Sequence, residues 1–387
     1  MARRRTSRTR KAGSPALLLY ADSERNADQL YFSGFHVPDP FIAMRVGGRK
    51  IGVVGALEFG RTLKESDFDE VLSFEQWQET ARKKLDCEQP RAAEVIVALA
   101  RSRRLKRFTV SPDFSYKLAL RLAELGLRLD VPEGALLPQR EIKTDEQAKA
   151  IAAGNRCSAL GLAAAEDALR RSTVRRGRLV LDGRPLTSER VREAIDIACL
   201  RAGAVASHTI VAGGDQACDP HCSGSGMLRA GELIIVDIFP RVTATGYNGD
   251  MTRTFLKGTP NDAQVKLVET VRAAQKAALA EIRANVHGSR VHQRVIDFFQ
   301  DAGYETTHGV EGSSGFFHGT GHGLGLEVHE APNMGRNATV LRHGAVVTVE
   351  PGLYYRGLGG CRIEDVVQVT RSKPRMLSRY HYEWIIA

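Results

Sequence analysis

Five side chains able to bind a metal ion occur in order through the second half of the chain. They are Asp237, Asp250, His322, Glu350 and Glu364. Each lies in a stretch typical of a buried strand or a glycine-rich turn, where an acid is unfavourable unless a cation compensates its charge. Two divalent metal ions would provide that compensation, and two ions that share a water molecule form the centre of a hydrolase.

The first two acids flank a predicted hairpin. Asp237 interrupts the apolar run of residues 233–239, and Asp250 follows Asn248 and Gly249, which allow a tight turn that returns the chain beside Asp237. A single acid of this kind could equally cap a turn at a strand end. Two carboxylates brought together repel each other unless a cation lies between them, so the pair favours a metal site.

Three histidines, His318, His322 and His329, follow within twelve residues. The spacing of the first two matches zinc ligands on a helix, but four glycines between residues 319 and 325 make a helix implausible. We instead expect an extended loop that lets the backbone approach a metal or a substrate closely. A lone histidine would more often be structural, and three together favour a functional site.

The last two acids also follow apolar strands. Glu350 ends the run of residues 345–350, and Glu364 comes two residues after Arg362. The period of two along a strand places Arg362 and Glu364 on one face. The simplest interpretation of that pair alone is an ordinary salt bridge.

Taken in order, these stretches resemble the pita-bread metallopeptidases, the family that contains methionine aminopeptidase, aminopeptidase P and prolidase. The matching stretches are residues 236–238, 249–254, 318–329, 348–354 and 362–365. The resemblance covers roughly residues 142–387 and, weakly, the N-terminal part. It implies that Asp237 chelates a first metal ion, that Asp250 and Glu364 bridge both ions, and that His322 and Glu350 bind the second.

The same resemblance implies the remaining roles. His221 would stabilise the transition state or contact the substrate, His329 would contact the scissile amide, and His318 and Arg362 would line the substrate pocket. We expect Mn²⁺ in the site, with Co²⁺ or Zn²⁺ as alternatives, because the ligands are hard. A hydroxide that bridges the two ions would attack the peptide carbonyl, and Glu350 would pass a proton to the leaving amine.

The length of 387 residues suits two domains. Alternating strands and helices predict a smaller α/β domain over residues 15–138, and prolines 132 and 138 mark a linker. A long amphipathic helix then begins near Thr144 or Asp145, either of which could be its N-cap. We expect an α+β protein with a pita-bread catalytic domain over residues 139–387, preceded by a creatinase-type N-terminal domain.

The N-terminal domain indicates the branch of aminopeptidase P and prolidase, because methionine aminopeptidases lack a substantial domain there. Residues 28–35 look like the early strand-and-turn segment of that domain. In these relatives the domain helps to limit substrate length, often across a dimer, so the resemblance implies a homodimer. The interval from Asp237 to Asp250 is slightly longer than usual in the family. We expect the extra residues to lengthen the hairpin around residues 241–245 without moving Asp250.

Charge and composition exclude some classes of protein. The formal net charge is +10, and six basic residues lie in residues 1–14, which we expect to be a disordered basic tail, with a transit peptide as the alternative. No nucleic-acid motif accompanies this segment or the basic cluster at residues 101–107, so we expect no nucleic-acid partner. No apolar run approaches twenty residues, which excludes a membrane span. Six scattered cysteines without a signal peptide indicate reduced thiols in the cytoplasm.

The sequence therefore predicts a dinuclear metallo-exopeptidase that acts on peptides with proline at the second position. It would be an Xaa-Pro aminopeptidase or an Xaa-Pro dipeptidase, which the sequence does not distinguish. Two other classes share the scaffold: a metal-free hydrolase of the creatinase type and a catalytically silent binding protein. Both predict lost ligands, whereas all five ligands are present here.

Overall fold

The computed structural model describes residues 16–310 and 312–387. The chain divides between Pro138 and Gln139 into two compact units, each of which is described separately. Residues 1–14, predicted to be a disordered basic tail, lie outside the described residues. In the described part of the chain, no helix has both the length and the apolar content needed to cross a bilayer.

The first unit is built on one mixed six-stranded sheet in the order β4-β3-β2-β1-β5-β6. Its strands are β1 (Leu17–Ala21), β2 (Phe41–Val46), β3 (Arg49–Val54), β4 (Glu70–Ser73), β5 (Arg107–Thr109) and β6 (Arg128–Asp130). Its helices are α1 (Ala27–Ser33), α2 (Ala56–Glu65), α3 (Phe74–Leu85), α4 (Ala92–Ser102) and α5 (Tyr116–Glu124). Strands β2 and β3 pair antiparallel as a hairpin whose turn is formed by residues 47 and 48.

One prediction for this unit is wrong. Residues 28–35 were expected to form a strand and a turn, but most of them belong to helix α1. The Asn26 side chain accepts a hydrogen bond from the backbone N–H of Gln29, and Gly34 ends the helix with a left-handed φ of 77°. These two caps stabilise a helix of only seven residues, whose apolar spacing is too short to indicate one.

The second unit holds four long helices and several small sheets. The helices are α6 (Asp145–Arg171), α7 (Ser188–Arg201), α8 (Asp262–Glu281) and α9 (Gly288–Asp301), with 3-10 turns η1 (Pro138–Glu141) and η2 (Gly214–Cys218). The main sheet has the order β11-β12-β14-β22, from strands β11 (Ile210–Gly213), β12 (Ile234–Ile238), β14 (Met251–Lys257) and β22 (Ile385–Ile386).

The later strands of the second unit form further small sheets. A second sheet joins β17 (Val346–Val349), β20 (Asp365–Gln368) and β21 (Arg375–Met376), and a hairpin joins β18 (Gly352–Tyr355) to β19 (Gly359–Arg362). The remaining strands form peripheral ladders: β7 (Thr173–Arg175), β8 (Arg178–Leu181), β9 (Arg184–Pro185), β10 (Ala204–Val205), β13 (Arg241–Val242), β15 (Thr307–Gly309) and β16 (Gly312–Ser314).

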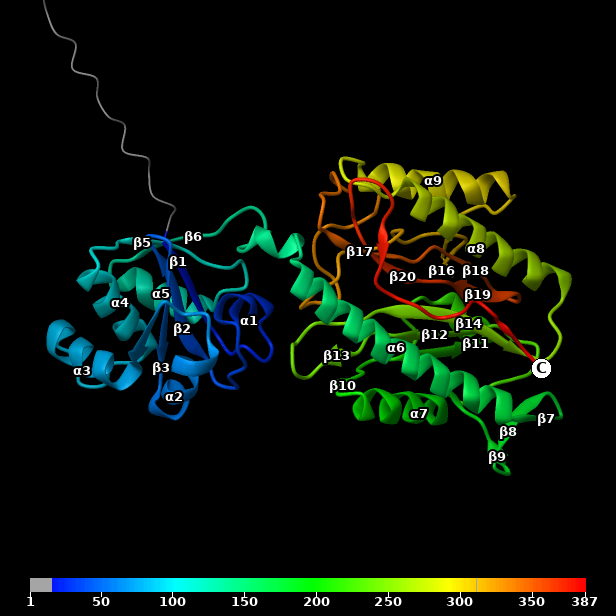
Figure 1. The fold of residues 1–387 in the computed structure, drawn as a ribbon, viewed down its shortest axis with the longest axis horizontal. Helices are drawn as coiled ribbons and strands as arrows, with labels where there is room; N and C mark the ends of the chain where they lie inside the picture. Colours follow the sequence, from blue (N-terminus) through cyan, green and yellow to red (C-terminus); the bar gives the residue numbers. More distant parts are fainter. Residues whose placement is uncertain (1–15, 311) are drawn as a thin grey trace, which may run out of the picture. The chain divides into compact units, whose positions relative to one another are not determined.

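The helices cover the strands of the second unit in two layers (Figure 1). Helices α6 and α7, drawn green, pack with β11, β12 and β14 around one apolar cluster. Helices α8 and α9, drawn yellow, pack with the later strands around a second cluster. The strands that carry the predicted ligands therefore lie between two layers of helices, where an acidic side chain is shielded from water.

The start of α6 follows the predicted capping pattern. The Thr144 hydroxyl accepts from the Gln147 backbone N–H, and the Gln147 side chain accepts from the Thr144 N–H. This reciprocal pair is a capping box, and it fixes the first turn of the helix. Further along α6, a Cβ on Gly154 would lie 2.4 Å from the backbone nitrogen of Gly249. Helix α6 therefore packs directly against the segment that precedes Asp250.

Candidate metal centre

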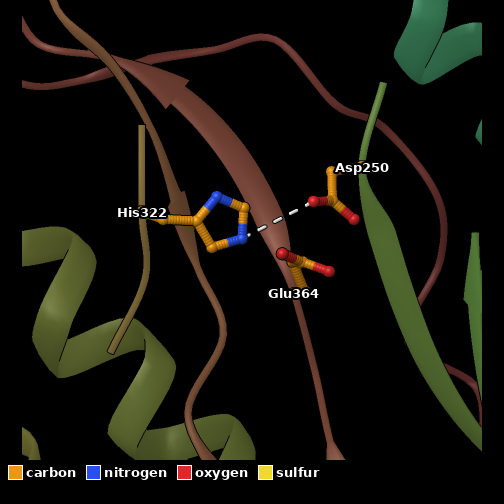
Figure 2. A group of neighbouring side chains, drawn as sticks. All are labelled: Asp250, His322 and Glu364. Carbon is orange, nitrogen blue, oxygen red and sulfur yellow. Dashed lines mark ion pairs between the residues drawn. The ribbon is translucent and has the colours of Figure 1, made fainter. Parts of the chain in front are cut away.

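Three of the predicted ligands meet at one point (Figure 2). Asp250, His322 and Glu364 each offer a ligand atom, and these atoms lie within 4.8 Å of one another. Asp250 immediately precedes β14, and Glu364 lies between β19 and β20. His322 lies on the glycine-rich loop that leads towards β17. The three come from segments more than forty residues apart, so tertiary folding alone brings them together.

The other two predicted ligands lie on either side of this group. Glu350 follows β17, and its Oε1 atom lies 3.3 Å from Nε2 of His322. Asp237 lies on β12, next to the β14 strand that follows Asp250. Its Oδ2 accepts from Nη2 of Arg362 at 2.7 Å. Its buried Oδ1 has no hydrogen-bond partner among the described residues.

The arrangement leaves negative charge uncompensated. Asp237, Asp250, Glu350 and Glu364 line one cavity, and Arg362 is the single lysine or arginine side chain among the described residues that line it. Burial, followed by the neighbouring carboxylates, raises the pKa values of Asp250 and Glu364 well above their usual range. Burial also raises the pKa of Glu350 to about 7. These acids can ionise together only if further cations enter the site.

The donor set fits divalent metal ions. Four carboxylates and one imidazole suit Mn²⁺, Co²⁺ or Zn²⁺, and the unpartnered Oδ1 of Asp237 is available to a cation. Burial lowers the pKa of His322, so its ring is neutral and can bind a metal through nitrogen. Nδ1 of His322 is 3.2 Å from the carbonyl oxygen of Gly323, which can only accept a hydrogen bond. Nδ1 therefore carries the proton, and Nε2 faces the carboxylates.

Backbone pairing holds the histidine loop against β17. The His322 N–H donates to the Thr348 hydroxyl, and the Thr348 N–H donates to the His322 carbonyl. Two residues further, the Glu350 N–H donates to the carbonyl of Thr320. The backbone of the histidine loop therefore pairs with β17 much as a further strand would. A Cβ on Gly321 would lie 2.1 Å from the Thr348 carbonyl oxygen, which is why this close approach requires glycine.

The two acids of the predicted hairpin lie close together, but the turn differs from the expectation. The chain reverses at residues 242–246, where the Gly246 N–H donates to the Val242 carbonyl. Asn248 is not in the turn: its backbone and side-chain N–H groups both donate to the Gly325 carbonyl. Within the same interval, β13 pairs with β10, and Asp250 lies 3.7 Å from His322.

The predicted catalytic and substrate-binding residues line the same cavity, whose volume is about 780 Å³. His221 follows η2 and is exposed, and its backbone N–H donates to the Asp219 carboxylate. His329 is also exposed, and its ring lies 4.3 Å from the ring of His322, nearly perpendicular to it. Both imidazoles therefore face the open part of the cavity, where a substrate would enter.

His318 and Arg362 already have partners within the protein. Nδ1 of His318 donates to the Gly319 carbonyl, so its Nε2 accepts from the Tyr354 hydroxyl at 2.8 Å. Arg362 donates to the same hydroxyl at 3.1 Å. Burial, followed by the charge of Arg362, lowers the pKa of His318 to about 3, so the ring is neutral. These side chains form a wall whose hydrogen bonds are largely satisfied internally.

Sequence reasoning missed several residues in and behind the cavity. Tyr354, which is fully buried, was part of a matching stretch, but nothing in its spacing indicated that its hydroxyl joins Arg362 to His318. Phe317, Phe239 and His208 line the cavity itself. Phe317 packs 5.3 Å from Tyr354. No periodic pattern distinguishes these residues from ordinary loop or core positions.

The alternative interpretation of Arg362 and Glu364, an ordinary salt bridge between them, is wrong: the ion pairs of the described residues do not include it. Arg362 pairs with Asp237 instead, and Glu364 accepts from the Thr252 hydroxyl at 2.8 Å. The cause is topological: β12 and β14 lie beside β19, so both side chains find partners that are distant in sequence.

Comparisons of sequence agree with this geometry. Residues 149–371 match the model of metallopeptidase family M24. An Xaa-Pro dipeptidase of Pyrococcus furiosus is 34% identical over 177 residues, which is 45% of this chain and 48% of the relative. A putative dipeptidase of Bacillus subtilis is 37% identical over 180 residues, which is 46% of this chain and 47% of the relative. The matched part spans about half the length of these curated relatives.

Comparisons of structure extend over both units. An X-Pro aminopeptidase from Thermotoga maritima has a TM-score of 0.80 at 22% identity, covering 96% of this chain and 97% of that chain. A prolidase from Pyrococcus furiosus has a TM-score of 0.76 at 23% identity, covering 95% and 97%. At such identities the likeness shows the fold. The predicted α+β pita-bread fold with a smaller N-terminal domain is confirmed.

Proposed function

Because this chain belongs to metallopeptidase family M24, we propose that it is an exopeptidase that hydrolyses the bond between an N-terminal residue and proline. The observation that carries the proposal is the convergence of Asp250, His322 and Glu364 in a buried cavity with an excess of carboxylates. The names of the similar proteins, Xaa-Pro dipeptidase and X-Pro aminopeptidase, support the choice of substrate.

Five residues would hold two divalent metal ions. Asp237 would bind the first, Asp250 and Glu364 would bridge both, and His322 and Glu350 would bind the second. When bound, the ions would lower the pKa of a shared water molecule and polarise the scissile carbonyl. We propose Mn²⁺, with Co²⁺ and Zn²⁺ as alternatives that the same ligands accept.

The other residues would act on the substrate. His221 and His329 are exposed at the open part of the cavity, where their N–H groups can donate to the substrate carbonyl as negative charge develops. A donor of that kind is worth roughly 2–4 kcal/mol in other hydrolases. Glu350 would carry a proton to the proline nitrogen as the peptide bond breaks. Tyr354 would hold His318 in place beside them.

One experiment tests this function. The purified full chain is loaded with Mn²⁺ and assayed on Xaa-Pro dipeptides, Xaa-Pro-Yaa tripeptides and Xaa-Ala controls, with and without a chelator. We expect cleavage that requires proline and is lost with the metal. Turnover that survives removal of all metal would instead indicate the creatinase type of hydrolase. Absence of both turnover and bound metal would indicate a binding protein.

The same assay separates two versions of the function. A dipeptidase would prefer the dipeptides, whereas an aminopeptidase would also cleave the tripeptides efficiently. We also propose a homodimer, which light scattering of the full chain tests.

A further inference from the structure

One wall of the cavity ends in a histidine to which the metal site gives no role. His208 precedes β11, is exposed, and lines the cavity together with Ile210 and Phe239. In the β11–β12 ladder, Ile210 is opposite Asp237. Extending that register by two residues places His208 opposite Phe239. The wall therefore leads from the ligand Asp237 past an aliphatic and an aromatic side chain to an exposed imidazole.

The backbone of His208 is unusual. Its φ is 60°, in the left-handed region that side-chain-bearing residues seldom adopt. The described part of the chain has five other non-glycine residues in this region, and none of them lines the cavity: Asp86, Arg104, Arg176, Asp182 and Asn285. The next residue, Thr209, is buried, and its hydroxyl has no hydrogen-bond partner among the described residues. Local strain of this kind is concentrated at functional sites.

We propose that His208 is a specificity-determining residue that contacts the side chain of the substrate's N-terminal residue and favours an acidic one. This inference rests on the proposed function, because an exopeptidase must accept a free α-ammonium group. Asp219 is an exposed carboxylate that lines the cavity and can accept from that group. A substrate held there would extend its first side chain along Ile210 and Phe239 to His208.

The chemistry of the wall selects the class of side chain. A ring N–H of His208 can donate to a carboxylate. The single arginine of the cavity, Arg362, already donates to Asp237 and Tyr354 and is only 3% exposed. An acidic side chain that extends along Ile210 and Phe239 would take its hydrogen bond from His208, because His221 and His329 are assigned to the scissile carbonyl. A lysine ammonium in the same position would find only a ring nitrogen as acceptor, which carries no negative charge.

The test compares three dipeptides, Glu-Pro, Ala-Pro and Lys-Pro, on the Mn²⁺-loaded full chain. We expect the wild type to cleave Glu-Pro with a kcat/KM about tenfold above that for Lys-Pro, the discrimination that one polar contact can supply. His208→Ala should remove most of this preference, because it should lower kcat/KM for Glu-Pro more than for Ala-Pro or Lys-Pro. His208→Asn should behave similarly. Because asparagine tolerates a left-handed backbone, the same loss in this variant would show that misfolding of His208→Ala is not the cause.

The matched control is His343→Ala, which removes another exposed histidine that does not line the cavity. Calorimetry adds a readout without turnover: the wild type should bind the product L-glutamate more tightly than L-alanine, and both His208 variants should lose that difference. Equal effects of His208→Ala on all three dipeptides, or no effect on any, would overturn the inference. Turnover of Ala-Pro by the wild type would still support the proposed function in that case. Absence of all Xaa-Pro turnover in the wild type would overturn both.

Discussion

Nη2 of Arg362 lies 2.7 Å from Oδ2 of Asp237, deep in the cavity, and both side chains are almost fully buried. This pair joins β19 to β12, two strands that are more than one hundred residues apart in the sequence. It orients one carboxylate oxygen and leaves the other, Oδ1, without a partner among the described residues. Arg362 thus positions Asp237 while preserving one oxygen for a metal ion.

Asp250→Asn should abolish activity and leave the protein folded. The variant removes a carboxyl group whose ionisation is unfavourable in the metal-free protein, because burial and Asp237 raise the pKa of Asp250. We therefore expect the metal-free variant to melt at or above the temperature of the metal-free wild type. Metal analysis should show fewer bound ions, and kcat should fall by at least about 100-fold.

The control for this variant is Asp301→Asn, at the exposed end of α9. It should change neither metal content nor turnover. A fully active Asp250→Asn variant with normal metal content would contradict the assignment of this residue as a ligand.

Tyr354→Phe should weaken catalysis through His318. The hydroxyl donates to His318 and accepts from Arg362, and its loss leaves both partners unsatisfied inside the protein. We expect a loss of about 1–3 kcal/mol in the free energy of unfolding, together with a lower kcat/KM. Tyr355→Phe is the matched control, because that hydroxyl bonds the Glu305 carbonyl away from the site. Equal stability and activity of the two variants would refute this role.

Gly154→Ala should reduce metal affinity without touching a ligand. The added methyl would lie 2.4 Å from the backbone nitrogen of Gly249 and would push away the segment that immediately precedes Asp250. A titration of the metal-free protein with Mn²⁺ measures the effect. Gly60→Ala in α2 is the control, since a Cβ there meets nothing within 4 Å. That variant should be as stable as the wild type or slightly more so.

Glu330→Gln should loosen the loop that carries His322 and His329. The side chain of Glu330 is only 7% exposed and pairs with Lys143 at 2.5 Å and Arg140 at 2.7 Å. Breaking a buried pair costs roughly 3–5 kcal/mol, because the partner charges are left uncompensated. We expect this loss in urea unfolding. Glu327→Gln removes a more exposed partner of Arg140 and should cost far less free energy of unfolding. Equal losses in the two variants would contradict the role of Glu330 in holding the loop.

Stability should depend on pH through Glu166. Burial alone would raise its pKa, but hydrogen bonds from Tyr380, Arg170 and His381 outweigh burial and lower it below the ordinary value. A carboxylate with a lowered pKa stabilises the folded state at any pH above its pKa in the unfolded chain. This contribution is lost as the pH falls through its lower pKa in the folded protein. Unfolding at pH 7 and pH 4 should show a smaller loss for Glu166→Gln than for the wild type. An identical acid dependence in the two proteins would disprove the effect.

Several features could be predicted from the sequence because their causes are local. The cap at Thr144 and the long helix that follows it depend on neighbouring residues, whose spacing is visible directly in the sequence. The ordered metal ligands were also visible, because each is an acid or a histidine in an otherwise apolar or glycine-rich stretch. Helix α1 was missed, since its seven residues give too little periodicity to outweigh the resemblance to a strand and turn.

The sequence by itself determined which groups could bind a metal and which family the chain resembles. Only the tertiary structure decided that Arg362 pairs with Asp237 rather than Glu364, that Tyr354 joins Arg362 to His318, and that His208 lines the cavity. The physical reason is that ion pairs and cavity walls depend on distances in space. The packing of distant strands sets those distances, and spacing along the chain does not encode them.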